Sequence, residues 1–387
     1  MNTTSTIDII AIARQLAADF ATRAEEADKQ AKLPSEDVKA LTESGYVLMS
    51  VPREYGGMGL TLKECVEAQL ELAKGSTSSA MVAGMQIHMF GNVSENRPWS
   101  EAAFERMSRA AVAGGLFNTA ASEPTLGSPS RGGAFETNAV RSDVGWVING
   151  HKTWTTGGKH LTHIVVRLDV EGESAVIVIP ANTPGVEWVE TWGNGLSLRA
   201  SDSHDVYFKD VVVPEENLLE RGKRDDKTPN AWFPMIMAAV YLGTAIAARD
   251  AVIQFGLERI PTALGKPITT LPKIQRQIGE IDLALMASRA LMLEVASQWT
   301  GDERSKGLFP RIAAAKHMAT ETANMVTDKA LQIAGGTSLT RDLPLERFFR
   351  DTRAGLMQPP SGDTALEIVG RGAIEQISKK MSEQDTA

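Results

Sequence analysis

The spacing at which apolar residues recur changes twice along this chain of 387 residues. From residue 7 to about 113 the spacing is helical, as in IDIIAIARQLAADF and LKECVEAQLELAKG. From about 114 to 219 apolar and polar residues alternate, and turn residues arrive every ten residues or so, which is typical of strands. After residue 230 long apolar helical segments return. The chain therefore reads as helices, then strands, then helices.

This order predicts an α+β fold in three parts. We expect an α-helical N-terminal domain over 1–113, a middle β-barrel or β-sandwich domain over 114–226, and a C-terminal helical bundle over 227–387. The polar stretch ERGKRDDKTPN, which ends at Asn230, would be a linker or an exposed loop.

Two local signals give sharper expectations. Ser35 precedes Glu36 and Asp37, which predicts a helix N-cap with acids in the first turn, and Gly45 predicts the end of that helix. The pair Asn149–Gly150 in GWVINGHKTW predicts a tight hairpin turn between two short strands.

Composition excludes several classes of protein. The net charge of −8 argues against a general binder of nucleic acid or anionic membranes. Cys65 is the only cysteine, so we expect no intrachain disulfide, no cysteine-based metal site and a reducing, cytoplasmic location. The opening residues lack the pattern of a secretion signal, and no run of 18 uninterrupted apolar residues predicts a spanning helix. No spacing of His and carboxylates suggests a metal site.

Two segments carry groups suited to holding a flat ligand. AASEPTLGSPSRGG, residues 120–133, offers serine hydroxyls, among them Ser122 and Ser128, and glycines that permit close backbone approach. In KTWTTGGK, residues 152–159, Trp154 would lie against a heterocycle while Thr156 bonds its edge. Taken singly, each segment is a weak signal, and residues 120–133 alone read as an ordinary loop.

A third segment, QIAGG at 332–336, closes a helix. Its glycines stand where a helix C-cap is expected, and they would equally admit a phosphate or an adenine.

The order and spacing of these segments resemble the acyl-CoA dehydrogenase family of flavoproteins over nearly the whole chain. The matching segments are VPREYGGMGL, SEPTLGS, VINGHKTWTTGGK, LRASDSHDVYFKDVVVPEENLL, LQIAGGTSL and ERFFRDTR. The resemblance implies a helical N-domain, a middle β-domain, a C-terminal four-helix bundle and bound FAD. It also implies an acyl-CoA or similar thioester substrate, an electron-transfer partner or flavin reductase, and a homodimer or homotetramer, because the family's FAD site spans two subunits.

The resemblance assigns roles to the cofactor residues of the middle part. Ser122 would hydrogen-bond the flavin ring, Trp154 would shield it, and Thr156 would face the region of flavin N5. Ser128 would lie near the phosphates of the cofactor or of CoA.

The C-terminal part would serve the far end of the cofactor. Arg259 would reach the pyrophosphate across a subunit interface, and Gln332, Gly335 and Gly336 would lie near the adenine. The chain departs from the family here, since two extra residues precede Gly265–Lys266 and the usual Phe is missing.

The largest departure concerns the catalytic base. Removal of an α-proton needs an ionised group within reach of the carbon, and most family members use a Glu shortly after the RD segment. Ungapped counting from Arg350–Asp351 places Pro359 on that Glu. In a minority branch the Glu lies on the long helix after the linker, and that place is Phe233. Neither residue can accept a proton.

Three explanations stay open. Asp363, four residues beyond Pro359, would be a displaced base, or else an ordinary helix N-cap. Alternatively the chemistry needs no α-proton removal, as in the flavin monooxygenases and acyl-CoA desulfinases of this fold. His88 in the substrate pocket would suit a monooxygenase, although a structural histidine is the plainer reading. The third explanation is a non-catalytic flavin or acyl-CoA binder.

We therefore interpret the chain as an FAD-dependent oxidoreductase acting on the CH–CH group of an acyl-CoA thioester, with Phe233 and His88 lining the substrate pocket.

Overall fold

The computed structural model describes residues 8–126, 134–222 and 230–385, and the chain divides into two compact units, 1–228 and 229–387. Ser128 and residues 223–229 of the expected linker lie outside the described residues. The domain boundaries predicted near 113 and 226 stay predictions.

Unit 1 begins with helices, as the apolar spacing predicted. They are α1 (Ile9–Ala21), α2 (Ala24–Gln30), α3 (Ser35–Glu43), α4 (Leu62–Leu72), α5 (Thr77–Asn96) and α6 (Glu101–Val112). The prediction that Ser35 is an N-cap was wrong. Pro34, with φ −66° and an extended ψ of 126°, takes the cap position, so Ser35 is already the first helical residue. Gly45, with φ 71°, follows the helix end as predicted.

Eight strands form the sheet of unit 1. They are β1 (Phe117–Ala120), β2 (Asn138–Ser142), β3 (Gly145–Thr155), β4 (His163–Val170), β5 (Glu173–Pro180), β6 (Val186–Val189), β7 (His204–Val213) and β8 (Leu218–Arg221). The strand order is β6-β7-β3-β2-β4-β5-β8, and β1 pairs in parallel with β4. Strand β3 pairs with β2 on one side and β7 on the other, so it is held in the middle of the sheet.

The hairpin predicted at Asn149–Gly150 was wrong. Strand β3 continues through both residues, and the turn lies earlier, where Ser142 pairs with Gly145. Asn149 instead exchanges two hydrogen bonds with Asp210, beside a register shift against β7. Gly150 has φ 150°, and a Cβ there would come within 2.5 Å of Thr137. The glycine is present because another backbone passes close to it, which local sequence cannot reveal.

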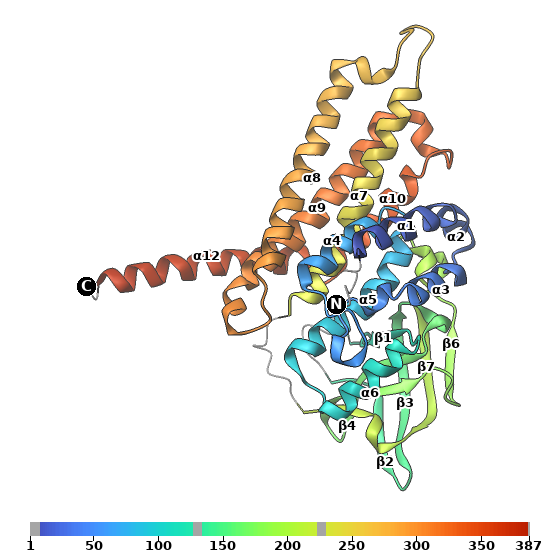
Figure 1. Ribbon diagram of the computed structural model, residues 1–387, viewed down its shortest axis with the longest axis vertical. Helices are drawn as coiled ribbons and strands as arrows, with labels where there is room; N and C mark the ends of the chain where they lie inside the picture. Colours follow the sequence, from blue (N-terminus) through green and yellow to red (C-terminus); the bar gives the residue numbers. More distant parts are fainter. Residues whose placement is uncertain (1–7, 127–133, 223–229, 386–387) are drawn as a thin grey trace, which may run out of the picture. The chain divides into compact units, whose positions relative to one another are not determined.

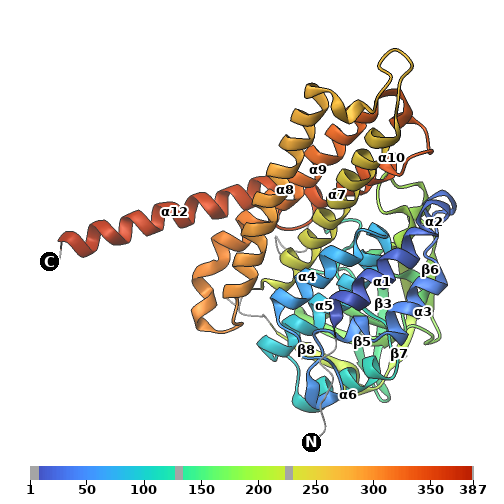
Figure 2. The same ribbon diagram turned by 45° about the horizontal axis from the view of Figure 1, so that its top comes forward.

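Helices and sheet in unit 1 share one hydrophobic core. Apolar side chains of α5 and α6 pack against strands β1, β4, β5 and β8, and the buried members include Phe90, Phe104, Phe117 and Val178. Figures 1 and 2 show the helices of unit 1 gathered on one side of the sheet.

Unit 2 is helical, as predicted. Its helices are α7 (Trp232–Glu258), α8 (Pro272–Gln298), α9 (Phe309–Ala334), α10 (Leu345–Thr352), α11 (Ala354–Met357) and α12 (Gly362–Asp385). Helix α9 contacts α7, α8, α10 and α12 and is the centre of the bundle. Helix α12 extends away from the other helices of this unit (Figures 1 and 2).

By length and composition, α7 could cross a membrane, because its most apolar window has a mean hydropathy of 1.6. The absence of an uninterrupted apolar run was therefore too weak a reason to exclude such a helix. However, 72% of that window is buried inside the structure, which is the usual situation of a core helix.

The close approach at Gly150 gives a testable prediction. Gly150→Ala should lower the free energy of unfolding by about 2 kcal/mol or more, because the new methyl group meets the Thr137 backbone. Gly172→Ala is the matched control, since Gly172 has φ 83° but nothing within 4 Å of an added Cβ. Urea unfolding of both variants checks this, and equal losses would contradict it.

Candidate functional site

Trp154 lies on an irregular part of β3. Lys152 pairs with Val206 and Thr155 with His204, so the register shifts between these two positions. Trp154 has φ 57°, which is unusual for a bulky residue, and its side chain is 61% exposed. Such strained positions persist where the surroundings enforce them, and they cluster at ligand sites. The bulge turns a large flat ring away from the core and leaves it open to a ligand.

Ser122 lies beside this bulge. Its carbonyl oxygen accepts a hydrogen bond of 3.0 Å from the backbone N–H of Thr153, the residue before Trp154. The Ser122 side chain is partly exposed. The structure thus brings together two of the predicted cofactor residues, which are 32 positions apart in the chain.

A buried ion pair fixes this junction. Lys152 Nζ lies 2.6 Å from Glu123 Oε1, and the two side chains are 0% and 1% exposed. The Glu123 carboxylate also accepts the backbone N–H groups of Glu136 and Thr137. The Lys152 ammonium additionally lies 4.3 Å from the centre of the Phe135 ring. The pair therefore holds the 122–123 segment, residues 135–137 and β3 to one another.

The pKa values of the pair reflect burial and mutual attraction. Burial lowers the pKa of Lys152 from 10.5 to about 8, although Glu123 opposes this. Burial alone would raise the pKa of Glu123, but hydrogen bonds from Lys152, Thr137 and two backbone N–H groups outweigh it and lower that pKa. Both side chains are therefore charged at neutral pH. The sequence alone does not reveal this pair, because only the fold brings residues 123 and 152 together.

Thr156 lies just beyond the bulge and is 6% exposed. Its hydroxyl lies 2.9 Å from the Ser203 hydroxyl, which in turn lies 2.7 Å from the Ser201 hydroxyl. Its carbonyl accepts a hydrogen bond of 2.9 Å from the Asn118 side chain. Thr156 is thus anchored by both its backbone and its side chain.

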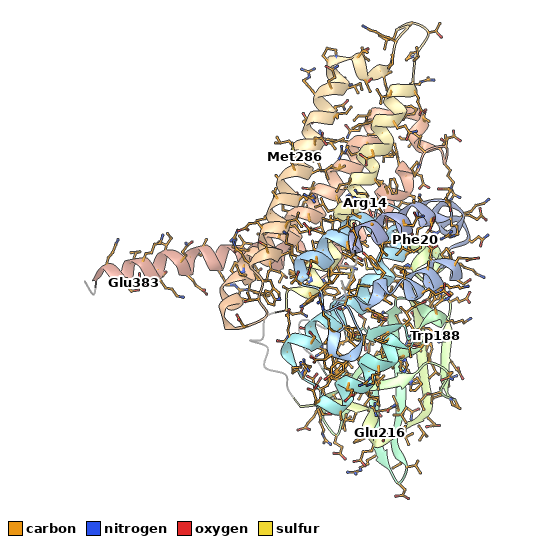
Figure 3. All side chains as sticks on the ribbon, in the orientation of Figure 1. Arg14, Phe20, Trp188, Glu216, Met286 and Glu383 are labelled. Carbon is orange, nitrogen blue, oxygen red and sulfur yellow. The ribbon has the colours of Figure 1, made fainter. Side chains whose placement is uncertain are left out.

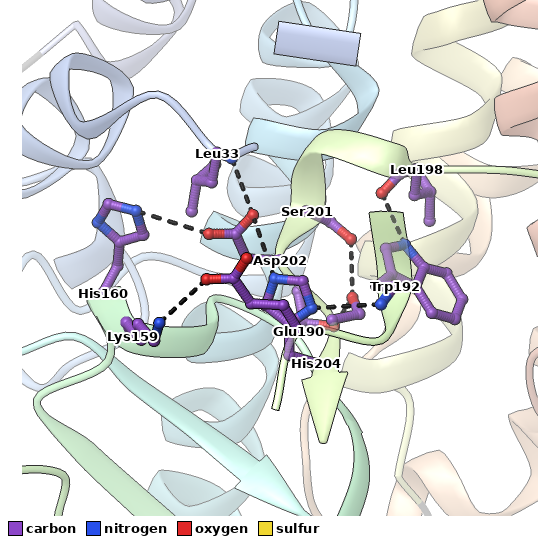
Figure 4. A network of polar contacts seen from close by, with 11 residues as sticks. Leu33, Lys159, His160, Glu190, Trp192, Leu198, Ser201, Asp202 and His204 are labelled. Carbon is purple, nitrogen blue, oxygen red and sulfur yellow. Dashed lines mark hydrogen bonds and ion pairs between the residues drawn. The ribbon is translucent and has the colours of Figure 1, made fainter. Parts of the chain in front are cut away.

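Asp202 stabilises the segment that carries these serines (Figure 4). Its Oδ1 accepts the backbone N–H of Leu33 at 2.9 Å, which ties the helical part of unit 1 to the start of β7. The rings of His160 and His204 lie 3.7 and 3.8 Å from its carboxylate. Asp202 has φ 45°, a conformation that Asp tolerates better than most residues.

His88 lies on α5, and its side chain is partly exposed. Burial by the surrounding chain lowers the pKa of this imidazole from 6.5 to about 4. The ring is therefore neutral at physiological pH, where it can donate one hydrogen bond and accept another.

The predicted adenine-end residues of unit 2 lie at helix ends. Arg259 is exposed and caps the C-terminus of α7, where its N–H bonds the Phe255 carbonyl at 2.9 Å. Gly335 caps α9 with φ 61° and ψ −139°, and Gln332 and Gly336 beside it are exposed. The C-terminal ends of α7 and α9 lie at the same end of the bundle (Figure 1). The structure thus brings Arg259 and the QIAGG segment to one end of unit 2.

The turn that carries Pro359 is held by a lysine that the sequence analysis missed. Lys316 on α9 is 1% exposed, and its Nζ donates hydrogen bonds to the carbonyls of Gly355, Gln358 and Pro360 at 2.8, 2.7 and 3.0 Å. Burial lowers the pKa of Lys316 from 10.5 to about 8, which still leaves it mostly charged at pH 7. The only signal in the sequence was one lysine in the small, apolar run IAAAKHMA.

Gly355 of this turn has no room for a side chain. A Cβ there would lie 2.8 Å from the Tyr241 ring and 3.0 Å from Thr320. The backbone of residues 355–360 is therefore fixed from both sides, by the Lys316 ammonium and by close packing.

Asp363 is not a helix N-cap. Helix α12 begins at Gly362, and the Ser361 carbonyl accepts the N–H of Ala365, so Asp363 is the second helical residue. Its side chain is exposed. Phe233 is likewise the second residue of its helix, α7, and is partly buried.

Comparison with known proteins identifies the family. Three models match in chain order: acyl-CoA dehydrogenase, N-terminal domain, over 5–99; middle domain, over 118–211; and C-terminal domain, over 235–357. These three matches, in this order, place the chain among the oxidoreductases of the acyl-CoA dehydrogenase type. This chain belongs to the acyl-CoA dehydrogenase family.

Its relatives differ in their described activities. The protein named "Putative acyl-CoA dehydrogenase YdbM" from Bacillus subtilis (strain 168) is 35% identical over 93% of this chain and 95% of its own. The mitochondrial short-chain specific acyl-CoA dehydrogenase of Bos taurus is 30% identical over 88% and 84%. The amino sugar nitrososynthase RubN8 of Streptomyces rubradiris is also 30% identical, over 90% and 85%.

Solved structures show the same fold. Butyryl-CoA dehydrogenase from Megasphaera elsdenii superimposes with a TM-score of 0.83 at 23% identity, covering 97% of this chain and 99% of that one.

The buried pair gives the second prediction. Lys152→Met should lower the free energy of unfolding by about 3–5 kcal/mol, because it leaves the Glu123 carboxylate buried without its cation. Lys159→Met is the matched control, since Lys159 and Glu190 form an exposed pair, and stability should hardly change. Urea unfolding at pH 7 measures both. A small loss in Lys152→Met would show that the pair does not hold the junction.

Proposed function

We propose that this chain binds FAD and oxidises the CH–CH bond next to the carbonyl of an acyl-CoA thioester. The observation that carries the proposal is the exposed Trp154 ring on the bulge of β3, backed by the buried Glu123–Lys152 pair. A rigid aromatic surface with hydroxyls beside it fits a flat, polar-edged heterocycle such as a flavin. When bound, the flavin supplies the acceptor for the hydride that leaves the substrate.

Each cofactor residue then has a role that fits its place. The Ser122 hydroxyl bonds the ring, the Trp154 ring covers it, and the Thr156 hydroxyl faces its N5 region. Arg259, Gln332, Gly335 and Gly336 are exposed at one end of the bundle of unit 2, which suits contact with the pyrophosphate and adenine of a partner subunit's FAD. Ser128 would lie near the phosphates of the cofactor or of CoA.

Asp363 is the proposed base. Its carboxylate is exposed on the first turn of α12, four residues after Pro359, and the neighbouring turn is held by Lys316. The substrate's electrons then leave through an electron-transfer partner, and we place the reaction in the cytoplasm.

A titration tests this proposal. The purified protein, titrated anaerobically with saturated acyl-CoAs, should lose its oxidised flavin absorbance. Asp363→Asn should slow this bleaching by about 100-fold or more, since general-base catalysis contributes about that much. Glu367→Gln is the control, because Glu367 is another exposed carboxylate on the same helix. Bleaching that survives Asp363→Asn would remove Asp363 as the base. No bleaching with any thioester would remove the dehydrogenase reaction.

A second candidate is a flavin-dependent monooxygenase or another reaction without α-proton removal, such as desulfination. Two features favour it: ungapped counting places Pro359 on the family's usual base, and the His88 ring is neutral. The nitrososynthase relative is as similar to this chain as the short-chain dehydrogenase is. Oxygen consumption that requires an added flavin reductase would support this candidate, and a flavoprotein inert in both assays would be a binder only.

We further propose that the chain assembles into a homodimer or homotetramer through unit 2. Beyond Gly372 the side chains of α12 are exposed up to residue 384, and an isolated helical segment this short is marginal in water. Leu366, Ile374, Ile377 and Met381 are 54%, 68%, 56% and 61% exposed at helical spacing. Met286 on α8 is likewise 63% exposed and projects outward (Figure 3). Such apolar stripes fit burial against a second copy.

The stripe on α12 makes this testable. Ile377→Asp should shift the protein to a smaller species in analytical ultracentrifugation, because it places a charge in the proposed contact. Gln376→Asp adds the same charge outside this stripe, about 100° around the helix from Ile377, and should leave the assembly intact. An unchanged sedimentation profile for Ile377→Asp would exclude this face.

A further inference from the structure

Three hydroxyl groups form a buried chain in unit 1. Thr156 Oγ1 and Ser203 Oγ are 2.9 Å apart, and Ser203 Oγ and Ser201 Oγ are 2.7 Å apart. The three residues are 6%, 4% and 0% exposed. Within the described ranges, none of these hydroxyls has another hydrogen-bond partner.

The position of each hydrogen follows from this arrangement. Each hydroxyl has one hydrogen to donate, and a buried donor left unpaired costs about 1–3 kcal/mol. The fully buried Ser201 hydroxyl can use its hydrogen only by donating to Ser203. The Ser203 hydroxyl then donates to Thr156, its remaining partner. The Thr156 hydroxyl accepts this bond, so its own hydrogen must point away from Ser203 and Ser201.

We propose that Ser201 and Ser203 are positioning residues that make the Thr156 hydroxyl a fixed hydrogen-bond donor toward the bound cofactor. This inference rests on the proposed function, in which Thr156 faces flavin N5. A hydroxyl that accepts one hydrogen bond becomes a stronger donor of the next, because each bond in a chain polarises its neighbour. Ser201 therefore acts on the cofactor through three hydrogen bonds in series, the last of which Thr156 donates.

A fixed donor discriminates between the two redox states of a flavin. In oxidised flavin, N5 has a lone pair that accepts a hydrogen bond, whereas in reduced flavin N5 carries a hydrogen. The Thr156 hydroxyl therefore stabilises the oxidised state. To accept a hydrogen bond from N5–H of reduced flavin, the Thr156 hydroxyl would have to donate its own hydrogen to Ser203, and Ser203 would have to donate to Ser201. The Ser201 hydrogen would then be buried without a partner. Ser201 and Ser203 thus lower the midpoint potential of the bound flavin.

The test is the midpoint potential of the purified holoprotein, measured by equilibration with a reference dye. Ser203→Ala should raise the ratio of reduced to oxidised flavin at a fixed potential by about two- to fivefold, given the strength of one hydrogen bond. This corresponds to a shift of about 10 to 20 mV for a two-electron couple. Ser201→Ala should shift the potential in the same direction by less, and Ser203→Thr, which keeps the hydroxyl, should not shift it.

Two further variants distinguish an effect that passes through the Thr156 hydroxyl from a general disturbance of the structure. In a Thr156→Val background, Ser203→Ala should cause no further shift, because its effect passes through the Thr156 hydroxyl. Thr155→Val is the matched control, since the Thr155 hydroxyl is also buried but has no hydrogen-bond partner among the described residues. Should Ser203→Ala fail to fold, Ser201→Ala carries the same prediction.

The outcomes are distinguishable. A shift that persists in the Thr156→Val background, a shift of opposite sign, or an equal shift in Thr155→Val would overturn the inference while leaving the proposed function intact. A protein that retains no flavin, or a Thr156→Val variant with an unchanged potential, would overturn the proposed function, and this inference with it.

Discussion

The attraction between Glu123 and Lys152 holds the candidate site of unit 1 together. A charge pair this deeply buried, 2.6 Å apart, is costly to separate because neither charge can return to water without opening the sheet. The carboxylate also accepts the N–H groups of residues 136 and 137, so one side chain connects three segments of backbone. Trp154 can keep its unusual backbone conformation because the residue two positions before it is fixed in this way.

Unit 2 uses the same principle without a carboxylate. Lys316 is charged and buried, and its described hydrogen-bond partners are three backbone carbonyls of one turn. Both units thus use a buried lysine to fix a segment that carries residues of the proposed site. In each case burial lowers the lysine pKa to about 8, so alkaline conditions would weaken both anchors.

The sequence predicted the order of helices and strands because apolar spacing is a local property that survives in the fold. The end of α9 before Gly335 followed from the glycines after it, because glycine readily adopts the backbone conformation that ends a helix. The hairpin at Asn149–Gly150 failed because a glycine required by a passing strand looks the same as one required by a turn. Glu123–Lys152 and Lys316 were missed because their partners lie 29 to 44 positions away.

The hydrogen bonds that Lys316 donates to this turn bear on how different reactions can arise within one fold. Its bonds go to backbone oxygens of residues 355, 358 and 360, so none depends on which side chain stands at position 359. The shape of the turn is therefore independent of the chemical group displayed there. A scaffold of this kind can exchange a carboxylate for an inert ring at one position without rebuilding its surroundings. A chain with a proline at position 359 can therefore keep this turn as ordered as a chain with a carboxylate there.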